Sequence, residues 1–182
     1  MTPRFLGLSF QFDTNRINAR QKLPAMNQLK KWRDEEVIEL LSSAPVIREA
    51  TAGDDPRRTA EAYSYVFTLD TAESADEIAV KGKIEQVLFP GGAQTDSDRQ
   101  DVRIVAHARK HRCILVTNDG DSKRQPGGIL GHRQELAAIG VTVMTDEEAA
   151  VLVAAKIAGR DEAARHLAKV TGEPLPEWVG CD

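Results

Sequence analysis

Acidic residues stand directly after two short apolar segments of this sequence. Asp13 follows FLGLSFQF (5–12), and Asp119 follows CILVT (113–117) in the stretch ILVTNDGDSK. A turn is the simplest reason for Asn-Asp-Gly, but the polar SKRQPGG that comes next cannot form a returning strand. Carboxylate oxygens are the ligands that hard divalent cations prefer in proteins. We therefore treat these two acids as candidates for a metal site.

A third acid, Asp101, lies in the predicted helix SDRQDVRIVAHARKH (97–111). At about 100° per residue, it falls within about 60° of the apolar stripe of that helix, which contains Ile104, Val105 and Ala108. An aspartate on the core side of a helix is costly unless it is paired or bound to a metal. His107 and His111 fall more than about 80° away by the same count, and we expect them on a solvated face.

A fourth acid, Glu49, lies in the first turns of the helix that is predicted after VIELL (37–41). Taken singly, each acid fits a purely structural role: Asp13 as a helix cap, Glu49 as a first-turn acid favoured by the helix dipole, and Asp119 as a turn residue. In a parallel sheet, however, these three positions share one edge, and four acids that meet there with Asp101 are harder to explain by separate structural roles. Carboxylates that close raise each other's pKa, and Mg²⁺ or Mn²⁺ would remove the repulsion.

The elements that must position these acids alternate between short apolar strands and amphipathic helices. This alternation predicts an α/β fold, with a central, mainly parallel sheet in three α/β/α layers, where functional groups collect beyond the carboxyl ends of the strands. The strands are expected at 5–12, 37–41, 113–117 and 141–144, and the main helices at 25–32, 42–50, 73–89, 97–111 and 129–140.

The middle and the end of the chain are less regular. Residues 53–94 are an insert or helical region of uncertain structure, although Ser74 and Glu77 form a capping box in it. A second capping box, Thr145 with Glu148, starts extra C-terminal helices, which Gly159 should divide. We expect one domain at 1–146 and a C-terminal helical extension at 147–182.

Composition and charge exclude several classes of protein. The chain has 182 residues, 41% hydrophobic and 29% charged, with no apolar run of membrane-spanning length and no signal-peptide pattern. Cys113 and Cys181 form no metal-binding or disulfide pattern, so we expect a reduced, cytoplasmic protein in which Cys113 packs as a small hydrophobe. The net charge of −4 argues against coating nucleic acid by bulk charge, although residues 1–33 carry seven basic residues and one acid.

Other phosphate- or metal-binding motifs fail on spacing. A calcium loop that starts at Asp119 would need an oxygen ligand at Lys123 and a glycine at Arg124. A dehalogenase-type phosphatase needs DxD after its first strand, where this chain has DTN. PGGILG (126–131) matches neither a Walker loop nor a dinucleotide fingerprint, and we interpret its glycines as loop flexibility.

Four motifs together resemble the PIN domain family. They are FDTN with Asp13, PVIREA with Glu49, DVRIVAHA with Asp101 and ILVTNDGD with Asp119, in the family's order over residues 4–146. Residues 53–94 do not match the family pattern, and the chain continues past its usual last strand. Asp98 is a rival for the third acid, but it lacks the spacing to the apolar residues of its helix.

The resemblance implies a metal-dependent endoribonuclease that hydrolyses phosphodiester bonds of single-stranded RNA with Mg²⁺ or Mn²⁺. Asp13, Asp101 and Asp119 would hold the metal, and Glu49 would bind it directly or through water. The supporting residues that it implies are Asn15 and Thr117, which would orient carboxylates or the scissile phosphate, and Asp121 as a further acid. Arg16, Arg20 and Lys22 would contact flanking phosphates.

The resemblance leaves several roles open. Bacterial members are often toxins of toxin–antitoxin pairs, which would give this chain an antitoxin protein or a second copy of itself as a partner. The alternative is a PIN-like scaffold that binds RNA or protein without cutting it. A third role is that of a nuclease that acts on DNA or on structured RNA. No membrane partner is expected.

Overall fold

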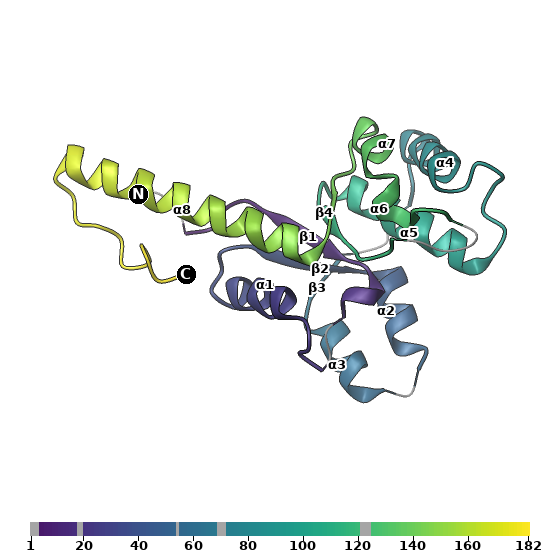
Figure 1. Ribbon diagram of the computed structural model, residues 1–182, viewed down its shortest axis with the longest axis horizontal. Helices are drawn as coiled ribbons and strands as arrows, with labels where there is room; N and C mark the ends of the chain where they lie inside the picture. Colours follow the sequence, from purple (N-terminus) through teal and green to yellow (C-terminus); the bar gives the residue numbers. More distant parts are fainter. Residues whose placement is uncertain (1–3, 18–19, 54, 69–71, 121–124) are drawn as a thin grey trace.

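Five parallel strands form the central sheet in the order β3-β2-β1-β4-β5, within the residues that the computed structural model describes (4–17, 20–53, 55–68, 72–120 and 125–182; Figure 1). The strands are β1 (Ser9–Phe12), β2 (Glu39–Ser43), β3 (Val66–Thr68), β4 (Ile114–Val116) and β5 (Val143–Met144). The register of the central strands pairs Phe10 with Leu40 on one side and with Ile114 on the other.

Helices cover both faces of this sheet, and the predicted three-layer α/β/α fold is confirmed. The helices are η1 (Thr14–Arg16), α1 (Pro24–Asp34), α2 (Ala44–Thr51), α3 (Pro56–Tyr63), α4 (Ala75–Leu88), α5 (Asp96–Lys110), α6 (Gly128–Gly131), α7 (Arg133–Ala138) and α8 (Asp146–Thr171). No helix of the described residues is both long and apolar enough to pass through a lipid bilayer.

Alternating side chains of the strands divide the core into two layers. Phe10 and Phe12 of β1 pack with α1 and with the first half of α8. Leu115 of β4 packs on the other face, against α4, α5, α6 and α7. Each of these three side chains is at most 1% exposed, and burying a side chain of this size contributes about 1.5–3 kcal/mol. Successive residues of a strand point to opposite faces, so a few residues per strand are enough for both layers.

Three capping boxes begin the long helices α4, α5 and α8. The predicted pairs Ser74–Glu77 and Thr145–Glu148 are both present, with reciprocal side-chain and backbone hydrogen bonds. The third box joins Thr95 to Asp98 at the start of α5. Each box satisfies backbone N–H groups that have no partner within the helix, which is why local sequence alone locates these ends well.

The predicted element bounds are less accurate in the middle of the chain. The uncertain region 53–94 contains α3, β3 and α4, and β3 becomes an edge strand beside β2. The single helix predicted at 129–140 is two short helices, α6 and α7. The strand predicted at 37–41 lies two residues further along, as β2.

The C-terminal helix α8 runs without interruption through Gly159, so the predicted break there is wrong. No described heavy atom lies within 4 Å of the place that a Cβ on Gly159 would occupy. One glycine in a helix interior costs only about 1 kcal/mol relative to alanine, and no proline lies within α8 to break it. Ala149, Val153 and Ile157 belong to the core below α1 and β1, while the later turns project beyond the sheet (Figure 1).

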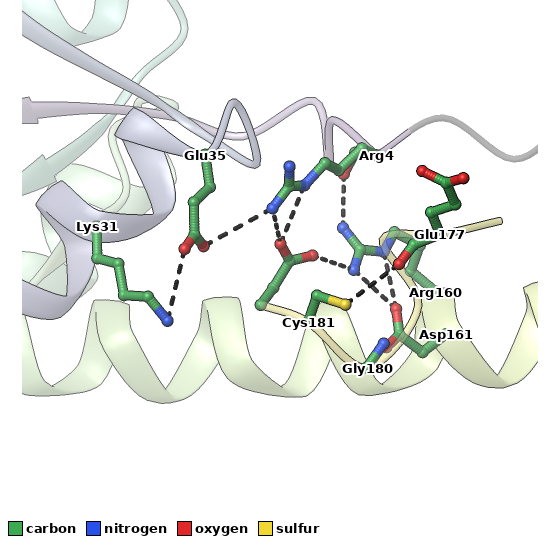
Figure 2. Close-up of polar contacts among 9 residues, drawn as sticks. Arg4, Lys31, Glu35, Arg160, Asp161, Glu177, Gly180 and Cys181 are labelled. Carbon is green, nitrogen blue, oxygen red and sulfur yellow. Dashed lines mark hydrogen bonds and ion pairs between the residues drawn. The ribbon is translucent and has the colours of Figure 1, made fainter.

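After α8 the chain turns back along this helix and ends in a group of ion pairs, shown in Figure 2. Asp182 accepts hydrogen bonds from the guanidinium groups of Arg4 and Arg160. Arg160 also contacts Asp161, with Nη2 and Oδ1 2.7 Å apart, and lies 4.3 Å from the centre of the Trp178 ring. We name Arg4, Arg160, Asp161 and Asp182 the C-terminal ionic cluster. It ties the start of the chain to its end.

One prediction about α5 is wrong. His107 is buried, at 7% exposure, instead of facing solvent. Its Nδ1 lies 3.1 Å from Oε1 of the fully buried Gln11, and the Gln11 amide donates to the backbone oxygen of Ile104. A hydrogen-bonded partner on β1 removes the penalty of burying an imidazole, and helical spacing alone could not reveal that partner.

Candidate active site

The four acids singled out by the sequence line one cavity of about 540 Å³ at the carboxyl edge of the sheet. Asp13 follows β1, Asp119 follows β4 by three residues, Glu49 lies on α2 and Asp101 lies on α5. We name this cavity the acid pocket. It brings together side chains up to about a hundred positions apart in the sequence, because β1 and β4 are neighbours and end at the same edge.

Asp13 is the most constrained of the four acids. Its Oδ1 accepts the backbone N–H of Thr14 at 2.6 Å, so Asp13 also caps η1, as its structural role predicts. Its Oδ2 accepts from Asn15 Nδ2 and from Thr117 Oγ1, both at 2.7 Å. Asn15 and Thr117 therefore orient a carboxylate, which is one of the two roles that the resemblance implied for them.

Hydrogen bonds connect Asp13 to two of the other acids. The hydroxyl of Thr14 donates to Oε2 of Glu49 at 2.7 Å, and Oγ1 of Thr117 accepts the backbone N–H of Asp119 at 3.0 Å. Glu49 lies in the second turn of α2, beyond the first turn in which the helix dipole acts on an acid most strongly. The helix dipole therefore does not explain the position of Glu49.

Asp119 is fixed from its other side by the start of α6. Its Oδ2 accepts the backbone N–H of Ile129 at 3.0 Å, and its backbone oxygen accepts that of Leu130. Gly128 has a φ of +56°, and a Cβ there would lie 2.5 Å from the Asp119 backbone oxygen and 2.8 Å from Oδ2. We interpreted this glycine as loop flexibility, whereas its real role is to let α6 approach Asp119 closely.

Asp101 differs from the other three acids because no described residue donates a hydrogen bond to it. Burial raises its pKa, and the neighbouring carboxylates Asp13, Asp119 and Glu49 raise it further, to about 7. Burial also raises the pKa of Asp13 against the hydrogen bonds from Thr117 and Thr14, with smaller contributions from Glu49 and Asp119. The charges of these acids therefore act on one another within the pocket, and no described basic side chain lines it.

Asp98, the rival for Asp101, also lines the acid pocket but is used as a helix cap. Its carboxylate accepts the backbone N–H groups of Gln94 and Thr95 and the hydroxyl of Thr95. Three donors at the first turn of α5 satisfy most of its oxygen lone pairs. The geometry separates a capping acid, Asp98, from an acid without a described donor, Asp101, one turn later.

Outside the pocket, a chain of contacts reaches Asp13 from the start of α8. The Asp146 carboxylate, at 1% exposure, pairs with Nη1 of Arg16 at 3.0 Å. Nε of Arg16 donates to Oδ1 of Asn15 at 3.0 Å, and the backbone N–H of Asn118 donates to the same oxygen. With Oδ1 engaged by two donors, the amide nitrogen of Asn15 must face Asp13.

Arg16 therefore pairs with a carboxylate of the protein, instead of contacting a flanking phosphate as the resemblance implied. Its guanidinium is nearly buried against Asp146, and its carboxylate partner was hidden from sequence reasoning because 130 residues separate the two. Arg20 and Lys22 are exposed on the segment before α1 and do not line the acid pocket. Asp121 lies outside the described residues.

Sequence reasoning also missed three contributors to this site: Thr14, Asp146 and Gly128. Thr14 lies within the FDTN motif, so its place next to Asp13 was a usable signal. Asp146 lies in the capping box of α8, which suggested a helix end and nothing more. Gly128 could not be distinguished from other loop glycines, because its constraint comes from an acid nine residues earlier.

The donor set of the acid pocket fits a hard divalent cation. Four carboxylates supply oxygen ligands, and no described basic side chain lines the pocket to neutralise them. Within the described part of the chain, no three His, Cys, Asp or Glu side chains already stand in the arrangement of a metal cage. The fit rests on the chemistry of the ligands and on their shared cavity.

Comparison with known proteins gives limited help. No protein-family model and no curated protein matches the chain. Among solved structures, it is similar to a chain in the crystal structure of VapBC2 from Rickettsia felis bound to a DNA fragment from their promoter. The TM-score is 0.47 at 14% identity, over 76% of this chain and 98% of that one. A likeness at this level says nothing about the activity or the partners of this chain.

Proposed function

We propose that this protein is a metal-dependent endoribonuclease of the PIN-like type, which hydrolyses single-stranded RNA at the acid pocket. The observation that carries the proposal is the meeting of Asp13, Glu49, Asp101 and Asp119 in one cavity. No described basic side chain lines the pocket. It therefore holds an excess of negative charge, which a divalent ion would neutralise.

The residues of the chain have separable tasks in this proposal. Thr117 and Asn15 hold the Asp13 carboxylate in one orientation, and Thr14 holds that of Glu49. Asp101 accepts no hydrogen bond from a described residue, so both of its oxygens remain available to a ligand. A bound Mg²⁺ or Mn²⁺ would polarise the scissile phosphate, activate a water for in-line attack and stabilise the leaving oxygen.

The decisive experiment is cleavage of a labelled single-stranded RNA by the purified protein. We expect cutting with Mn²⁺ or Mg²⁺ and none with EDTA. Asp101→Asn should lower the rate by about 10³-fold, because several kcal/mol of transition-state stabilisation are lost with a metal ligand. Asp96→Asn is the matched control, since this acid lies on the same helix with a 99% exposed side chain.

Three results would redirect the proposal. Tight RNA binding without cutting in the presence of metal would favour the scaffold that binds RNA or protein. Cutting of single-stranded DNA or of structured RNA in preference to single-stranded RNA would change the substrate. Equal loss of activity in Asp101→Asn and Asp96→Asn would remove Asp101 from the site.

The narrower role as the toxin of a toxin–antitoxin pair remains part of the proposal. It requires a partner, either an antitoxin protein or a second copy of this chain, and it assumes the cytoplasmic location predicted from the sequence. Co-purification with the product of an adjacent gene, with loss of nuclease activity in the complex, would support it. A protein whose expression leaves growth unaffected would contradict it.

A further inference from the structure

A second cavity, of about 670 Å³, lies on the far side of α5 from the acid pocket and has the opposite charge. Side chains of α2, α4 and α5 line it, and its basic members are Arg48, Lys81, Arg103, Arg109, Lys110 and Arg112. We name it the basic cavity. By helical geometry, Arg103 lies about 200° around α5 from Asp101, so the two cavities flank the same helix.

The acids of the basic cavity do not cancel its positive charge. Glu73 pairs with Lys81 at 2.8 Å, and Glu77 pairs with Lys110 at 3.3 Å. Asp76 is the remaining acid among the described lining residues. The cavity has four arginines against this single acid. One of them, Arg109, donates Nε to the backbone oxygen of Ile139, a neutral group that does not cancel its charge.

Three of these four arginines have no described side-chain partner of any kind. Arg48, Arg103 and Arg112 are exposed, and no described residue forms an ion pair or a side-chain hydrogen bond with any of them. Like charges converge on one concavity only at a cost in free energy, which an anionic ligand would offset. Guanidinium groups are well suited to phosphate because they can donate two parallel hydrogen bonds.

Helices α2 and α5 each contribute residues to both cavities. Arg48 and Glu49 are consecutive on α2, and Arg103 follows Asp101 by two residues on α5. Each helix thus carries at least one acid of the acid pocket and one unpaired arginine of the basic cavity. Opposite sides of a helix are about 10–12 Å apart, so a short single strand could occupy both cavities at once.

We propose that the basic cavity binds backbone phosphates of single-stranded RNA that flank the bond cut in the acid pocket. This proposal rests on the proposed function and adds a substrate-binding site to it. Contacts of this kind position a strand without reading its sequence. They also explain how a protein of net charge −4 holds a polyanion: three unpaired arginines gather in a cavity that flanks the same helix as the acid pocket.

The test compares two triple variants that remove the same charge. Arg48, Arg103 and Arg112 are changed to glutamine in one, and the exposed residues Arg57, Lys156 and Arg165, which line neither cavity, are changed to glutamine in the other. Binding of a labelled RNA of about 16 nucleotides is measured in EDTA, between about 50 and 200 mM NaCl. Circular dichroism verifies that both variants are folded.

We expect the cavity variant to bind more weakly and with a flatter salt dependence. Removing one phosphate-binding arginine should reduce the slope of log K against log salt by about 0.7, so the loss of three should reduce it by about 2. With Mn²⁺ present, the same variant should raise KM and keep kcat, since these arginines bind substrate and transition state alike. The control variant should change neither quantity by a comparable amount.

The outcomes separate this inference from the proposed function. If wild-type protein cuts RNA but both triple variants show the same salt slope, the basic cavity is not a phosphate site and the nuclease proposal stands. If the slope falls only in the cavity variant but metal never produces cutting, the phosphate site stands and the nuclease proposal fails.

Discussion

The acid pocket and the C-terminal ionic cluster treat their carboxylates in opposite ways. In the cluster, burial would raise the pKa of Asp182, but hydrogen bonds from Arg160 and Arg4 outweigh it and hold the pKa below its usual value. In the pocket, burial and neighbouring carboxylates raise the pKa of Asp101 to about 7. The protein neutralises the acids of the cluster with its own arginines. No described basic side chain lines the acid pocket.

This difference indicates what each region does. An acid that is paired and hydrogen-bonded inside the protein holds elements together, and Asp182 connects Arg4 to Arg160 of α8. Acids gathered without compensation destabilise the metal-free fold, so their arrangement makes physical sense when a cation from outside completes it. Substitutions in the two regions should therefore change stability in opposite directions.

The largest expected effect is the loss of the central cation of the cluster. Arg160→Met should lower the free energy of unfolding by about 3–5 kcal/mol, because the buried Asp161 would lose its cationic partner and Asp182 would keep only Arg4. Urea denaturation measures this change. Arg165→Met, an exposed position on the same helix, is the control and should change little. Equal effects of the two substitutions would mean that the cluster is not a structural anchor.

A slightly smaller effect is expected from adding metal. Mn²⁺ at about 100 times its Kd should stabilise the native state by about 2.7 kcal/mol and raise Tm. Asp101→Asn and Asp119→Asn should abolish this response, whereas Arg160→Met should keep it although it begins from a lower Tm. A full response in Asp119→Asn would exclude this residue from the metal site, and loss of the response in Arg160→Met would break the contrast between the regions.

Asp146 tests whether an ion pair outside the pocket controls a carboxylate inside it. Asp146→Asn should release Arg16 and allow the Asn15 amide to turn away from Asp13, which we expect to weaken Mn²⁺ binding about 10–100-fold. Isothermal titration calorimetry measures this affinity. Glu162→Gln removes a charge from an exposed position further along α8 and should leave this affinity unchanged. If both variants bind Mn²⁺ equally, the chain of hydrogen bonds from Asp146 to Asp13 has no positioning role.

The last expected effect is a pH dependence of the metal-free protein. The folded pKa of Asp101 is about 7, above the unfolded value of about 3.9, so the native state binds more protons between these values. The resulting stability is complete below about pH 4 and is lost as pH rises through about 7. Thermal unfolding in EDTA should therefore show Tm falling from pH 5 to pH 8, with a shallower fall in Asp101→Asn.

Asp182 should show the opposite sign at lower pH, below the unfolded value of about 3.9. Its folded pKa is depressed, so its contribution to stability is present above the unfolded pKa and is lost as pH falls through the folded value. A wild-type protein whose Tm is flat from pH 5 to pH 8, and equal to that of Asp101→Asn, would contradict the proposed charge excess.

Much of this fold could be predicted because its signals are local. Two of the three capping boxes, the apolar strands β1 and β4, and the phase of Asp101 on α5 all depend on residues within one or two turns of each other. The alternation of strands and helices predicts a parallel sheet, which places three of the acids at one sheet edge. The structure brings all four acids into one cavity. Their proposed role as metal ligands stays a prediction.

The predictions that were wrong have a common cause. His107 seemed solvated because its partner, Gln11, is 96 residues away. Arg16 seemed free for the same reason, since Asp146 is 130 residues away along the chain. Gly128 looked like any loop glycine until the fold placed Asp119 against it. In each case the missing information was a tertiary contact that the sequence pattern does not encode.

The sequence by itself determined where carboxylates occur and which local structure carries each of them, because caps and helix periodicity act over a few residues. Tertiary structure alone decided which charges meet a partner. Arg160 reaches Asp182 and Arg16 reaches Asp146, whereas the acids of the pocket face one another. Pairing depends on side chains that folding brings together from distant positions, and the free energy of a buried charge is set by those neighbours.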